Sequence, residues 1–176
     1  MLQLALEDGV IDVVPAMPRI KQTDQPRVSF TDADYTALLD VGHQIAATGT
    51  TMVRGVTITT EHIDMMRFVV DSFLRPTETE LFGLRFGDVV VKRAPDHLEL
   101  TLNGKTGRRV SATLDGAIPV FHRQQTRYPN ATPSDYLFMP DYTNRTTAVN
   151  TYRRVFNHLL DVAGVKVDQS GGVRSP

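Results

Sequence analysis

Apolar residues recur every three or four positions over two long stretches in the first half of the chain, a spacing that predicts amphipathic helices. The first helix is expected over residues 32–47, where Thr31 offers a side-chain oxygen as N-cap. The second is expected to begin after Thr59 or Thr60 and to end before Pro76, because proline interrupts a helix. Each helix has one apolar face, so both are expected to pack against a common core.

The most regular helical pattern lies in the second half of the chain, from about residue 144 to residue 164, where Gly164 is a suitable C-cap. Two shorter helices are expected over residues 77–84 and 117–127. The latter contains Pro119, which a helix tolerates in its first turn because no backbone N–H is required there.

Three short runs rich in valine, leucine and threonine predict strands at residues 88–92, 97–102 and 109–113. Asn103 and Gly104 open the turn between the last two strands. The sequence therefore predicts an α+β fold, mainly helical, in which helices surround a small three-stranded antiparallel sheet.

The first 28 residues have no helical or strand period, and Pro15, Pro18 and Pro26 interrupt them. We interpret residues 1–28 as a linker or as the tail of a preceding element. Residues 29–176 are then expected to form one domain.

The composition is that of an ordinary globular protein, with 41% hydrophobic and 22% charged residues. Lysine and arginine number 19 against 20 acids, a formal net charge of -1, so any binding of nucleic acid has to come from a local basic patch. The absence of cysteine excludes disulfides and thiolate chemistry. No apolar run approaches a membrane span, which favours a cytoplasmic protein without membrane contact.

Residues 73–78 read Phe-Leu-Arg-Pro-Thr-Glu, an arginine at a helix junction with an acid three positions later. A guanidinium is always charged and offers a planar fork of donors that matches phosphate oxygens. Taken alone, Arg75 would be expected only to stabilise the end of a helix. Further along the chain, the hairpin at 103–109 carries Lys105 between glycines, a position that on its own would suggest a solvated turn residue.

Taken together and in this order, the arginine segment and the hairpin lysine resemble the catalytic domain of tyrosine recombinases, the phage integrase family. The resemblance extends from about residue 29 to the end, and residues 1–28 would then be the tail of the family's DNA-clamping domain. It implies that Arg75 binds the scissile phosphate, that Glu78 holds the guanidinium of Arg75 in place, and that Lys105 is the general acid toward the departing 5′ oxygen.

Family members cut and rejoin DNA through a 3′-phosphotyrosyl intermediate, without metal or cofactor. They use a His-x-x-Arg box and then a tyrosine nucleophile. No histidine here is followed by arginine three residues later, and all five tyrosines precede the point where the box should begin. We therefore expect this chain to be a fragment of a DNA recombinase or integrase that neither cleaves nor ligates DNA by itself.

The expected partner is double-stranded DNA. Residues 105–127 include five basic residues and only one acidic residue, Asp115. Besides Lys105, the four arginines of this segment are predicted to contact DNA, namely Arg108, Arg109, Arg123 and Arg127. The family works as a homotetramer on DNA, whereas this chain is expected to be monomeric in solution. The alternative is a non-catalytic DNA-binding or regulatory module with the same fold. A metal- or nucleotide-dependent enzyme is disfavoured because no motif for either was found.

Overall fold

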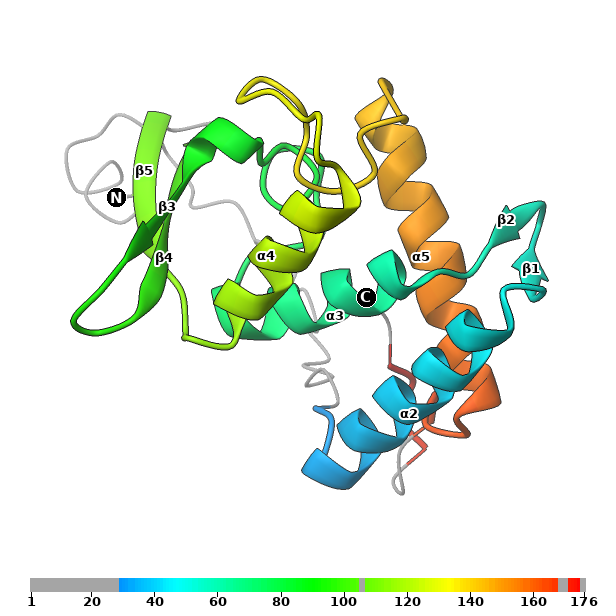
Figure 1. The fold of residues 1–176 in the computed structure, drawn as a ribbon. Coiled ribbons are helices and arrows are strands. Elements are labelled where there is room, and N and C mark those ends of the chain that lie inside the picture. The colour runs from blue at the N-terminus through cyan, green and yellow to red at the C-terminus, as the bar shows by residue number, and fades with distance from the viewer. Residues whose placement is uncertain (1–28, 105–106, 168–170, 175–176) are drawn as a thin grey trace, which may run out of the picture.

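The computed structural model describes residues 29–104, 107–167 and 171–174 (Figure 1). Within these ranges the chain is α+β. Its α-helices are α2 (Asp32–Thr48), α3 (Thr60–Ser72), α4 (Ala117–Arg127) and α5 (Arg145–Val162), with a short 3-10 helix, η1 (Phe86–Asp88). Its strands are β1 (Met52–Val53), β2 (Val56–Thr57), β3 (Val89–Lys92), β4 (His97–Gly104) and β5 (Gly107–Ala112). The four longer predicted helices and the three predicted strands are confirmed, with ends shifted by a few residues. The expected linker, residues 1–28, lies outside the described part.

Helix α2 begins where its sequence predicts. The Thr31 side chain accepts a hydrogen bond from the N–H of Asp34, at 3.2 Å, and the Asp34 carboxylate accepts one from the N–H of Thr31, at 3.1 Å. This reciprocal capping box satisfies two of the amides that a helix start leaves free. At the other end Gly49, with φ 64°, supplies the left-handed conformation that closes the helix.

The main sheet is antiparallel in the order β3-β4-β5. In its register Arg109 lies opposite Leu102, and Arg108 lies opposite Asn103. Directly opposed residues share a face of the sheet, and Leu102 is buried in the core. Arg109 therefore projects on the covered face, whereas Arg108 projects on the face that is open to solvent.

The helix expected over residues 77–84 does not form, and the prediction was wrong. Residues 74–84 instead fold into successive turns, closed by bonds such as Phe82 N–H to the Thr77 carbonyl, at 3.1 Å. Pro76 and two β-branched threonines disfavour a helix in this segment. In addition, the Glu80 side chain accepts a hydrogen bond from the backbone N–H of Arg75, and this bond favours a turn over a helix. We call residues 74–84 the arginine loop.

The β1–β2 hairpin was not predicted from the sequence. Its two-residue turn, Arg54-Gly55, has positive φ at both positions, 49° and 82°, as a type I′ turn requires. Two-residue strands leave almost no alternation pattern to detect.

The core joins the helices to the covered face of the sheet. Helix α3 packs against both α2 and α4, and α5 packs against α2 and α3 (Figure 1). Phe68, Phe82 and Phe138 are fully buried within it, and Phe82 brings the arginine loop into contact with Tyr152 of α5, with ring centroids 5.6 Å apart. No helix in the described part of the chain is long and apolar enough to cross a membrane.

Candidate anion-binding site

Arg75 is held by a buried carboxylate. Glu80 accepts hydrogen bonds from the Arg75 backbone N–H, at 2.9 Å, from Nε, at 2.8 Å, and from one terminal guanidinium nitrogen. The Glu80 side chain is only 6% exposed, whereas that of Arg75 is 76% exposed. The guanidinium is thus fixed on its inner edge and open to solvent on its outer edge.

Arg109 reaches the same carboxylate from the sheet. Its guanidinium lies 3.3 Å from Oε1 of Glu80, because the register of β5 turns this side chain toward the covered face. Two cations therefore share one anion, and the cluster of Arg75, Glu80 and Arg109 has a local charge of about +1 with donors facing water. Such a cluster can bind an oxyanion.

The cluster also keeps Glu80 ionised. Burial acts to raise the pKa of the Glu80 carboxyl, but the hydrogen bonds from Arg75 and the charges of Arg75 and Arg109 outweigh it. The pKa of Glu80 consequently lies below its ordinary value. At neutral pH the carboxylate is a fixed acceptor for both guanidinium groups.

The acid expected to orient Arg75 was Glu78, but the hydrogen bonds to Arg75 come from Glu80. Glu78 instead accepts a hydrogen bond from the hydroxyl of Thr146 at the start of α5, at 2.7 Å. Glu78 was chosen because a residue three positions after Arg75 would lie beside it in a helix. The arginine loop is not helical, and Glu80, five positions after Arg75, is the acid that contacts it. Lys105 lies outside the described residues.

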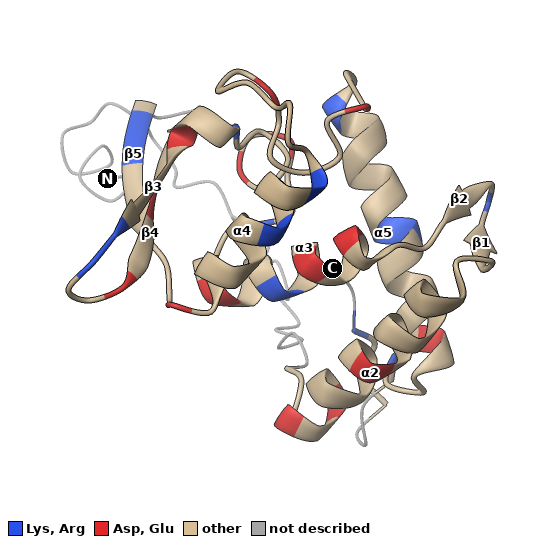
Figure 2. Ribbon diagram, viewed as in Figure 1, with Lys and Arg blue, Asp and Glu red and all other residues tan. Residues whose placement is uncertain are grey.

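Arg123 and Arg127 of α4, which we expected at a DNA surface, are tied to α3. Both bind Asp64, which is 3% exposed, at 2.7 Å and 2.9 Å, and Gln124 donates to it as well. Figure 2 shows the basic positions of α4 beside acidic positions of α3. Arg123 keeps 42% of its side chain exposed and Arg127 keeps 24%.

The four arginines therefore do not project as one patch. Arg109 joins Arg75 at Glu80, Arg108 lies on the open face of the sheet, and the α4 pair crosses to α3. Their closeness in sequence did not reveal this division, because side chains in a strand alternate between faces.

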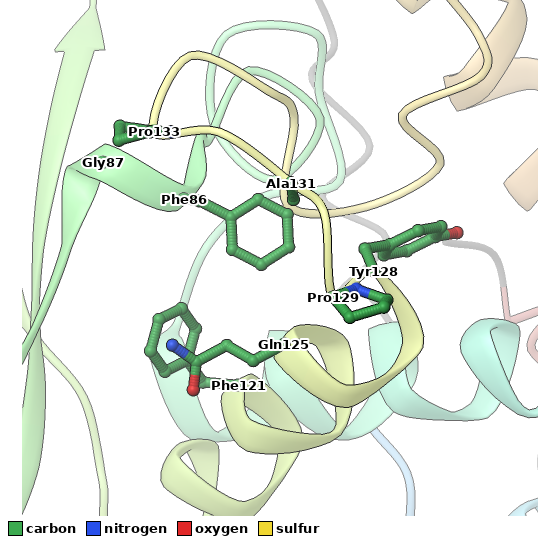
Figure 3. A pocket seen from close by; sticks show the side chains of 8 residues that line it. All are labelled: Phe86, Gly87, Phe121, Gln125, Tyr128, Pro129, Ala131 and Pro133. Atoms are coloured by element: carbon green, nitrogen blue, oxygen red, sulfur yellow. The ribbon is translucent and has the colours of Figure 1, made fainter.

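A separate pocket of about 230 Å³ lies between η1, α4 and the segment after α4. Phe86 and Phe121 stand next to each other in its wall, and Tyr128, Pro129 and Pro133 complete much of the lining (Figure 3). The residues of the anion-binding cluster do not line it. None of the side chains that line the pocket is charged.

All five tyrosines are half-buried or buried. Burial raises the pKa of Tyr35, Tyr128 and Tyr152, and Tyr128 in addition donates its hydroxyl to the buried Glu61, at 3.0 Å. Tyr136 has its ring beneath two guanidinium groups, those of Arg85 and Arg145. These contacts are those of core and interface aromatics.

Within residues 29–104, 107–167 and 171–174, no group of three or more histidine, aspartate or glutamate side chains could hold a metal ion. Comparisons of the chain with protein-family models, with curated proteins and with solved structures found no match.

Proposed function

We propose that residues 29–176 belong to a tyrosine recombinase catalytic domain and that their cluster of Arg75, Glu80 and Arg109 binds a phosphate of double-stranded DNA. The observation that carries the proposal is the pairing of an exposed guanidinium with a buried carboxylate that fixes its orientation. In a site for phosphoryl transfer, donors that are already oriented stabilise developing charge without reorganising.

The order of the elements along the chain supports the assignment. The hairpin of β4 and β5 reaches the arginine loop through Arg109, and Lys105 follows directly after Gly104, the last paired residue of β4. We propose Lys105 as the general acid for the departing 5′ oxygen, on a hairpin tied to the phosphate-binding arginine. Arg108, Arg123 and Arg127 are proposed as secondary contacts to neighbouring phosphates.

Binding of a short fluorescein-labelled DNA duplex at low salt tests the phosphate site. Arg75→Ala should weaken binding by about tenfold or more, the effect of removing a charge-assisted hydrogen bond pair. Arg154→Ala, which removes the same charge from an exposed position of α5, should change binding by about twofold at most. Equal losses in both variants would mean that only bulk charge matters and would reject the site.

Catalysis is tested in a protein that carries a downstream His-x-x-Arg box and tyrosine in addition to these residues. On a nicked DNA that traps the covalent complex, Arg75→Ala and Lys105→Ala should both reduce its formation by about two orders of magnitude. Full activity in both variants would reject the assignment. Duplex binding that depends on Arg75, without any covalent complex in the unmodified extended protein, would favour the non-catalytic DNA-binding module.

A further inference from the structure

The arginine loop is fastened to the first turn of α5 by two consecutive residues. Arg145 donates from Nε to the carbonyl of Phe82, at 2.6 Å, and Thr146 donates its hydroxyl to Glu78, at 2.7 Å. Phe82 and Glu78 lie on either side of Glu80, the residue that holds Arg75. Helix α5 thus contacts the loop on both sides of the carboxylate.

Arg145 is 9% exposed, and its bonds go to the main chain. Besides Phe82 it donates to the carbonyls of Phe138, at 2.7 Å, Met139, at 3.0 Å, and Tyr142, at 2.6 Å, and its guanidinium lies 4.0 Å from the ring centroid of Tyr136. A buried cation satisfied by carbonyl dipoles in this way fixes backbone positions. The Arg145 guanidinium therefore fixes the position of the arginine loop relative to residues 138–142, which precede α5.

The position of the Phe82 carbonyl is linked to that of Glu80 through backbone hydrogen bonds within the arginine loop. The Phe82 N–H bonds to the Thr77 carbonyl, at 3.1 Å, and the N–H of Leu84 bonds to the Glu80 carbonyl, also at 3.1 Å. These bonds join Phe82 to Thr77 and Leu84 to Glu80, so they couple the backbone that Arg145 holds to the residue that binds Arg75.

We propose that Arg145 and Thr146 are positioning residues, which hold the arginine loop so that Arg75 and Arg109 converge on Glu80. The inference rests on the proposed function, since phosphate binding is its readout. Thr146 gives the sharper test, because its bond is exposed and contributes little to stability, whereas loss of the buried Arg145 guanidinium could unfold the chain.

The test compares Thr146→Val, which keeps the shape and removes the hydroxyl, with Thr146→Ser, which keeps the hydroxyl. Thr146→Val should bind the fluorescein-labelled duplex about two- to tenfold more weakly, with an unchanged thermal midpoint, and Thr146→Ser should bind as the unmodified chain does. In an Arg75→Ala background, Thr146→Val should have no further effect, because it acts through Arg75.

Unchanged binding by Thr146→Val would overturn the inference, and so would an equal loss in the Arg75→Ala background. The proposed function is judged separately. If Arg75→Ala binds DNA as well as the Arg154→Ala control does, the phosphate site itself fails, whatever Thr146 does. Arg145→Lys, measured only if it folds, should weaken binding as well, because an ammonium lacks the fork that reaches several carbonyls at once.

Discussion

His62, at the third position of α3, is a buried histidine that stays neutral. It is 4% exposed, and its Nδ1 accepts a hydrogen bond from the N–H of Thr59, at 3.2 Å. Burial lowers the pKa of His62 to about 4. The unfolded chain takes up a proton on this residue near its ordinary pKa of 6.5, so folding stability is full above that pH and is lost as pH falls toward about 4.

We predict that His62→Gln makes the chain less sensitive to acid. Glutamine at this position keeps an acceptor for the capping box but does not titrate. Between pH 7 and pH 5 the loss in free energy of unfolding should be smaller in the variant by about 2 kcal/mol. Urea unfolding at the two pH values measures it, and parallel losses in both proteins would contradict the assignment.

Arg75 was chosen from the sequence because its residue type suits phosphate binding and its neighbours mark a helix junction, and its role in phosphate binding stays a prediction. The acid that orients it could not be chosen correctly. Glu78 and Glu80 are two residues apart, and which of them contacts Arg75 depends on whether the backbone after Arg75 is helical or folds into turns. Pro76 disfavours a helical conformation at Arg75 but does not determine the turns that follow.

At the scale of elements, the interface of α3 and α4 contains a buried acid with several cationic and polar partners. We predict that Asp64→Asn lowers the free energy of unfolding by about 1 to 3 kcal/mol, because an amide nitrogen then faces donors on Arg127 and Gln124. Asp161→Asn, in an exposed ion pair with Lys166, should cost about 0.5 kcal/mol or less. Urea unfolding compares the two, and equal costs would show that the Asp64 network is not what joins the helices.

The longer helices were predictable because their apolar periods and caps are local signals. Thr31 and Pro76 mark ends that the structure places within a few residues. The partners of charged side chains were not predictable, because Asp64 and Arg123 are 59 residues apart and no local pattern connects them. The same holds for the bonds from Arg145 to the arginine loop.

For the whole molecule, a formal net charge of -1 means that long-range attraction to DNA is weak. If the cluster of Arg75 and Arg109 neutralises one phosphate, the logarithm of the binding constant should fall against the logarithm of salt concentration with a slope of about -1, and each secondary contact from Arg108, Arg123 or Arg127 should make the slope steeper by about 1. Titrations of the duplex at several salt concentrations measure this slope. A flat line would reject phosphate binding, and a much steeper one would indicate many more cationic contacts than this cluster provides.

The pairing of Arg109 with Leu102 makes the contact with Glu80 depend on the register of the hairpin. One residue inserted after Arg109, with the rest of β5 held in its present register and no bulge formed, would move Arg109 opposite Asn103, on the face that is open to solvent and away from Glu80. Two added residues would restore the alternation. We therefore expect engineered variants that keep Arg109 opposite Leu102 to keep the contact with Glu80, and variants that shift this pairing by one residue without forming a bulge to lose it.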